Sequence, residues 1–154
     1  MKKNKIYFLT FIVVLLAFSS CRMGLDELPT FEEAEMTDFW FEYREIITKQ
    51  YPDGSSYEQV EFTDLKSACS FEVLSESGGT VEGKVTINKS QTDKDIKLSS
   101  ITGKAEISTA ATISPLDGSP RLGSPGDYSG KVSYKVVAAD GKTTKIFEIT
   151  TVLN

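Results

Sequence analysis

Histidine is absent from the 154-residue sequence, and this absence restricts the chemistry that the chain can perform. The Ser-His-Asp and Cys-His arrangements of nucleophilic enzymes and the histidine-rich catalytic zinc sites are excluded. Acidic residues are plentiful, but Asp93 and Asp95, like Glu32 and Glu33, lie in polar runs with nothing to desolvate one carboxyl group of a pair. Aspartates could ligate calcium, yet no ordered ligand loop of the helix–loop–helix kind is visible. The sequence therefore predicts a non-catalytic protein without a metal or cofactor.

Cysteine is scarce, because the chain contains only Cys21 and Cys69. If Cys21 is acylated, as argued below, Cys69 has no partner and no intramolecular disulfide can form. Cys69 lies beside Ala68 and two residues before Phe71, a setting typical of a small buried hydrophobe. No histidine is available to lower its pKa, so we do not expect Cys69 to be reactive.

The apolar run near the N-terminus is too short to span a membrane. Residues 6–18 make 13 residues, against roughly 20 for a transmembrane helix. Lys2, Lys3 and Lys5 precede the run, and two serines follow it. This order is typical of a secretory signal peptide, which we predict over residues 1–20.

The residues at the end of this segment resemble a lipidation site. Phe18-Ser19-Ser20-Cys21 resembles a bacterial lipobox, the site at which diacylglycerol is attached to the cysteine before cleavage. The departure is Phe18, where the family pattern prefers Leu. The alternative is ordinary signal cleavage near Ser20 with a chance cysteine behind it. The resemblance implies a lipoprotein with palmitate-like chains on Cys21, and each buried methylene contributes about 0.8 kcal/mol, so several chains suffice as an anchor.

Residues 21–35 are predicted to form a flexible acidic tether that begins with the lipidated cysteine. The segment shows no period of either two or 3.6 residues. Its acidic residues are Asp26, Glu27, Glu32, Glu33 and Glu35, with Pro29 among them. An acidic stretch in this place resembles the export signal that sends lipoproteins of Bacteroides-type bacteria to the outer face of the outer membrane. A plain solvated linker is an equal alternative.

Positive charge is in short supply. The chain has 17 basic and 22 acidic residues, and loss of the three lysines of residues 1–20 lowers the net charge from −5 to −8. So acidic a domain is a poor partner for nucleic acid. It is also repelled by anionic lipid head groups, so lipid on Cys21 must hold it to the membrane. Together with the lipid on Cys21, the resemblance of the acidic stretch to an export signal implies a lipid-anchored protein of the outer membrane that faces the cell exterior.

No sustained helical period is present after residue 36. Short runs rich in Val, Ile, Thr, Tyr and Phe recur instead, separated by turn-forming pairs. These pairs are Asp53-Gly54, Gly78-Gly79, Asp117-Gly118 and Asp140-Gly141. About seven such strands predict an all-β fold over residues 36–154, an immunoglobulin-like β-sandwich.

Alternation within the runs predicts which side chains face the core. One predicted face holds Phe39, Phe41 and Tyr43, with Trp40 on the opposite face beside Glu42 and Arg44. The next run holds Tyr57, Val60 and Phe62, where one break in the alternation predicts a bulge. A two-residue hairpin loop at Asp140-Gly141 fixes the register near the C-terminus, because it determines which residues oppose each other. The predicted pairs are Tyr134 with Phe147, Val132 with Ile149, and Val136 with Lys145.

Residues 110–115 and 134–149, with the Gly/Pro-rich connection between them, carry a family resemblance. They resemble the signature of immunoglobulin-like modules in surface lipoproteins of Bacteroides-type gut bacteria, a family of unknown function. The likeness covers residues 36–152 and is specific in the last third; Lys135 stands where the pattern often has Thr, and Phe147 where it often has Tyr. The resemblance implies a sandwich at the cell surface, beside carbohydrate-handling or adhesive machinery, with no catalytic residues to carry over.

The candidate binding residues lie in two places. The connection 114–130 holds three prolines and four glycines, so it is predicted to be either a binding loop or an ordinary crossover between sheets. Arg121, Asp127 and Tyr128 would offer charge, hydrogen bonds and a stacking face there. Trp40 could stack on a sugar ring, although a core position is the alternative. We therefore predict a binding or adhesion module for a glycan or a surface protein; the alternative is a structural spacer or scaffold subunit.

The anchor is tested by Cys21→Ala. We expect this variant to leave the membrane fraction, because it removes the thiol that carries the lipid. The measurement is incorporation of labelled palmitate together with membrane fractionation. Equal labelling of the wild type and the variant would contradict lipidation at Cys21.

Overall fold

Nine β-strands in two sheets make up the fold in the computed structural model, which describes residues 31–154. The strands are β1 (Met36–Gln50), β2 (Ser56–Asp64), β3 (Cys69–Ser77), β4 (Thr80–Ile87), β5 (Ile101–Ile107), β6 (Thr112–Leu116), β7 (Pro125–Gly126), β8 (Val132–Val137) and β9 (Thr144–Leu153). Helical structure in this part of the chain is limited to three single-turn 3-10 helices, η2 (Lys66–Ala68), η3 (Lys89–Gln91) and η4 (Leu98–Ser100). The predicted all-β sandwich is confirmed, whereas its immunoglobulin-like character stays a prediction.

The predicted signal peptide, the lipidation site Cys21 and most of the predicted tether lie outside the described residues. Within residues 31–154, no helix is long and apolar enough to cross a membrane. Only the end of the tether is described, and it has no regular secondary structure before β1 begins at Met36. The anchor therefore stays a prediction.

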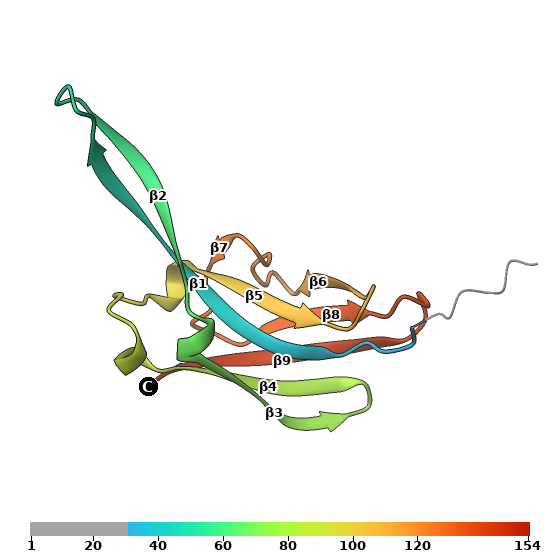
Figure 1. The fold of residues 1–154 in the computed structure, drawn as a ribbon. Helices are drawn as coiled ribbons and strands as arrows, with labels where there is room; N and C mark the ends of the chain where they lie inside the picture. Colours follow the sequence, from blue (N-terminus) through green and yellow to red (C-terminus); the bar gives the residue numbers. More distant parts are fainter. Residues whose placement is uncertain (1–30) are drawn as a thin grey trace, which may run out of the picture. The chain divides into compact units, whose positions relative to one another are not determined.

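The two sheets differ in the number of strands, and only the larger sheet contains a parallel pair of strands (Figure 1). The smaller sheet has the order β2-β1-β5-β7, and the larger has the order β3-β4-β9-β8-β6. Neighbouring strands are antiparallel except β4 and β9, which run parallel from the pair Thr80–Ile146 to the pair Ile87–Leu153. The C-terminal strand thus lies in the middle of the larger sheet.

Aromatic side chains from both sheets meet in the centre of the core. Phe39 and Phe41 on β1 are fully buried, as the alternation predicted, with their ring centroids 5.6 Å apart in an edge-to-face arrangement. Tyr134 on β8 lies 5.9 Å from Phe39 across the sandwich. Such tilted aromatic pairs add to the free energy gained from burying their apolar area.

The predicted register of the C-terminal hairpin is confirmed. Val132 pairs with Ile149, Tyr134 with Phe147, and Val136 with Lys145. The connection is wider than the predicted two-residue loop, since the last paired residues are Val137 and Thr144. Asp140 closes this loop by accepting hydrogen bonds from the amides of Lys142 at 2.8 Å and Thr143 at 2.9 Å.

Strands β1 and β2 continue beyond the sandwich as a projecting hairpin, which we call the arm (Figure 1). β1 pairs with β5 only as far as Glu42, and from there its partner is β2. Three apolar side chains on one face of the arm are exposed: Ile46 by 69%, Val60 by 46% and Phe62 by 58%. The predicted bulge between Tyr57 and Val60 is wrong, because the β1–β2 register is unbroken. The alternation of apolar residues is broken because Tyr57 lies on the face opposite Val60 and Phe62. Neither face of the arm is buried in the core, so neither face has to be apolar throughout.

The connection from β6 to β8 crosses to the other sheet and returns. Its middle forms β7, which pairs with Ile101 and Thr102 of β5. Tyr128 then enters the core, where its ring covers Gly103. The predicted crossover between sheets is therefore present, and one of its residues is a core residue.

Gly103→Ala tests how tightly this contact is packed. An added Cβ would lie 2.7 Å from Cζ of Tyr128, so the buried ring would have to shift. Overpacking of this kind costs about 1–3 kcal/mol, which we expect as a lower free energy of unfolding in urea, followed by circular dichroism. Gly130→Ala is the matched control, because its Cβ would meet no atom within 4 Å. Equal stability of the two variants would contradict the packing described here.

Candidate functional site

A pocket lies between the edge strand β6 and the crossover, and we call it the crossover pocket. It encloses about 360 Å³. Its lining residues are Ile113, Ser114, Pro115, Arg121, Leu122 and Tyr134. Small-molecule pockets range over about 300–1,000 Å³, so this volume suits one small ligand or the end of a larger one.

Hydrogen bonds to both sheets fix the crossover beside this pocket. The Tyr134 hydroxyl donates to the Pro120 carbonyl oxygen at 2.8 Å, and the Ser133 amide donates to the Ser119 hydroxyl at 2.8 Å. On the other sheet, the Gly123 amide donates to the carbonyl oxygen of Gly103 at 3.0 Å. The walls of the pocket are therefore held in place without a ligand.

Arg121, one of the sequence-predicted residues, is the charged residue of this lining. Its side chain is exposed and forms no ion pair with any acidic residue of the described chain. Arg44 differs, since its Nε lies 2.8 Å from Oε1 of Glu42 and its Nη2 donates to the Gly123 carbonyl oxygen at 2.9 Å. No acidic residue within residues 31–154 therefore occupies the Arg121 guanidinium.

Asp127 lies in a different pocket and is not brought together with Arg121. This second pocket encloses about 280 Å³, and its lining includes Asp117 and Lys131. The Asp127 carboxylate accepts hydrogen bonds from the Ser129 hydroxyl at 2.6 Å and the Ser129 amide at 2.9 Å. These hydrogen bonds lower the pKa of Asp127 and tie its carboxylate to the turn before β8.

The prediction that Tyr128 offers a stacking face is wrong. Its side chain is fully buried, and its ring lies 5.1 Å from Phe41. Its hydroxyl oxygen is 3.3 Å from that of Tyr134, and burial raises the pKa of the Tyr128 phenol. Tyr128 fills the space that Gly103 leaves open on β5, so it acts in packing and not in binding.

Trp40 lies on the outer face of its sheet, half-buried, as the alternation predicted. The ammonium nitrogen of Lys66 lies 4.3 Å from the centre of the indole ring and also contacts Asp38 and Glu106 at 3.2 Å each. A cation held over the ring occupies one of its two faces. Stacking of a sugar on Trp40 stays a prediction, and on that face it would require Lys66 to move.

The burial of Glu42, which lies beside Trp40, was not predicted from the sequence. This residue is only 7% exposed. Its carboxylate forms ion pairs with Arg44 and Lys104. Burial raises the pKa of Glu42, but hydrogen bonds from Lys104 and Arg44 outweigh this effect and hold the pKa below its usual range. The cluster holds one carboxylate and two cations, and both cations already contact that carboxylate.

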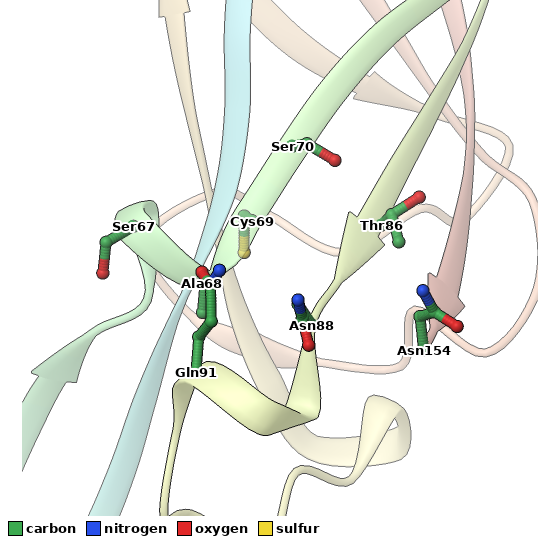
Figure 2. A pocket seen from close by; sticks show the side chains of 8 residues that line it. All are labelled: Ser67, Ala68, Cys69, Ser70, Thr86, Asn88, Gln91 and Asn154. Carbon is green, nitrogen blue, oxygen red and sulfur yellow. The ribbon is translucent and has the colours of Figure 1, made fainter.

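Cys69 lines a third pocket, where β3 begins and β9 ends (Figure 2). This pocket encloses about 330 Å³. Its lining residues are Ser67, Ala68, Cys69, Ser70, Thr86, Asn88, Gln91 and Asn154, and none of them has an acidic or basic side chain. Burial raises the pKa of the Cys69 thiol to about 11, so the nucleophilic thiolate is rare.

The described residues contain no group of three or more acidic or cysteine side chains that could hold a metal ion. The arrangement of residues 31–154 thus supplies a fixed pocket with one available cation.

These features define an all-β sandwich domain. Residues 36–150 match the family described as DUF5018-related, and the chain belongs to this family. A comparison with curated proteins found no match.

Two solved structures are similar to this chain. One is described as a "putative secreted protein" of Bacteroides fragilis NCTC 9343; it is 28% identical with a TM-score of 0.57, and the match covers 82% of this chain and 99% of that one. The other is described as a "putative glycoside hydrolase" of Bacteroides thetaiotaomicron VPI-5482; it is 16% identical with a TM-score of 0.43, and the match covers 85% of this chain and 28% of that one.

Cys69 provides a test of burial at the third pocket. With a pKa of about 11 in place of 9.0, its thiolate fraction at pH 8 is about a hundredfold lower, so we expect iodoacetamide to react slowly and the rate to rise steadily up to pH 10. Mass spectrometry of the intact protein measures the rate, and Cys69→Ser shows the labelling that occurs elsewhere. A rate at pH 8 equal to that of N-acetylcysteine would contradict the burial of this thiol.

Proposed function

We propose that this chain is a lipid-anchored protein of the bacterial cell surface that binds a ligand without transforming it. The N-terminal sequence supports export and lipid attachment at Cys21. The similarity to a Bacteroides protein described as secreted supports the same location. The membrane partner is then the bilayer that holds the lipid, and the acidic net charge of −5 argues against nucleic acid as a partner.

The observation that carries the binding function is the crossover pocket with Arg121, which forms no ion pair within residues 31–154. Binding sites are concave, mostly apolar and largely formed in advance, with a few polar groups that orient the ligand. Ile113, Pro115 and Leu122 supply apolar surface, while Arg121 supplies hydrogen-bond donors. No histidine is present, so general acid–base chemistry by the most common catalytic side chain is excluded. A glycan is the ligand class that we favour, and a surface protein is the alternative.

A second candidate function, that of a scaffold subunit, is supported by the arm. An isolated two-stranded hairpin is at best marginally stable in water, and this one exposes Ile46, Val60 and Phe62 on a single face. Exposed apolar patches of this kind are typical of protein interaction sites. In this function the arm would contact another subunit of a surface complex.

The binding function is tested by closing the pocket with Pro115→Trp, because Pro115 is exposed and lies opposite Tyr134 on the pocket face of β6. We expect the indole to occupy the space beside Arg121 and to weaken binding to a glycan array by about tenfold or more. Thr112→Trp is the matched control, because Thr112 is an exposed residue of the same strand on the other face and does not line the pocket. Loss of binding in both variants, or in neither, would contradict a ligand site in the crossover pocket.

The scaffold function makes a separate prediction. Phe62→Asp should then release a subunit that copurifies with the wild-type chain, while glycan binding is unaffected. Retention of that subunit by the variant would contradict a role for the arm.

A further inference from the structure

Two cations near the crossover pocket have no acidic partner among the described residues. Arg121 lines the pocket, and Lys135 lies directly opposite Ser114 in the β6–β8 ladder. Several other lysines, by contrast, form ion pairs with acidic residues, among them Lys84, Lys104, Lys131 and Lys145. In an acidic chain, an apolar pocket with an unneutralised guanidinium is a local site for an anion.

Acidic groups near this region do not neutralise Arg121. Asp117 and Asp127 line the neighbouring pocket, and Asp127 is held by Ser129. A planar guanidinium matches the two oxygens of a carboxylate through two parallel hydrogen bonds. The apolar side chains around it reduce the contact with water, which strengthens such charged hydrogen bonds.

The strand that borders the pocket argues against an extended peptide as the ligand. β6 is an edge strand, and a peptide could in principle add to it as another strand. Pro115 in β6 has no N–H to donate, so such a pairing would be interrupted. The free backbone groups of the edge suit the hydroxyls of a sugar, and Pro115 and Leu122 suit its C–H faces.

We propose that the crossover pocket binds a carboxylated sugar residue, with the carboxylate on the Arg121 guanidinium and the ring against Pro115 and Leu122. The proposal rests on the proposed binding function and specifies its ligand class. The carboxylate supplies the affinity through Arg121, and the ring supplies the fit to the apolar wall. A neutral sugar of the same ring shape therefore binds more weakly.

The test compares D-galacturonate with D-galactose, two sugars with the same ring configuration, by titration of the whole mature chain in detergent micelles with chemical-shift detection. Hydrogen bonds between charged groups correspond to about a tenfold to hundredfold change in affinity, so we expect galacturonate to bind at least about tenfold more tightly. Arg121→Ala should remove this preference, and Arg121→Lys should retain part of it because lysine keeps the charge without the planar fork. Lys142→Ala, which removes a charge on the β8–β9 turn, should leave the preference unchanged.

Four results would overturn the proposal. Equal affinity for the two sugars, or a preference that persists in Arg121→Ala, would exclude recognition of the carboxylate; if Pro115→Trp still abolished binding, the proposed function would stand without it. Acetate binding as tightly as galacturonate would show a site for any carboxylate, including a peptide terminus. Absence of galacturonate binding at millimolar concentration would also overturn it, and failure of every sugar on the array would remove the proposed function as well.

Discussion

The hydrogen bond from the buried Tyr134 hydroxyl to the Pro120 carbonyl oxygen is the interaction on which the rest of the structure depends. Tyr134 is fully buried, and a phenol in that position must find an acceptor, because an unpaired buried polar group costs about 1–3 kcal/mol. Burial raises the pKa of Tyr134 far above its usual range, and the hydrogen bond with Tyr128 raises it further. The hydroxyl therefore remains a donor at every pH that the folded protein encounters.

Because the Tyr134 hydroxyl donates to the Pro120 carbonyl oxygen, the crossover packs against the sandwich. Tyr128 follows Pro120 in the chain and fills the space over Gly103 on the opposite sheet, so one connection ties the two sheets together. Arg121 comes directly after the fixed Pro120 and extends outward, beside β6. The position of the crossover pocket is thus a consequence of core packing, and within residues 31–154 no acid forms an ion pair with its cation.

The sequence predicted the parts of the fold that obey strand alternation. The pairing of Tyr134 with Phe147 and the burial of Phe39 and Phe41 followed from period-two patterns and a turn signal. Alternation gave no guidance for Tyr128, because this residue lies between the two-residue strand β7 and β8, where no period can be read. It also misled in the arm, where Tyr57 lies on the face opposite Val60 and Phe62 and no core fixes the position of each apolar residue. Arg121 could be predicted from its place in a proline-rich connection, whereas its lack of an acidic partner depends on the fold.

Hydrogen exchange in Tyr134→Phe tests the central role of this hydrogen bond most directly. The substitution keeps the ring and removes only the donor to Pro120. The account predicts faster exchange at the amides of Gly123 and Ser133, which hold the crossover to the two sheets, with unchanged protection at Ile149 in the middle of the larger sheet. Tyr57→Phe on the arm is the control for loss of a hydroxyl. Wild-type exchange at Gly123 and Ser133 in Tyr134→Phe would contradict the account.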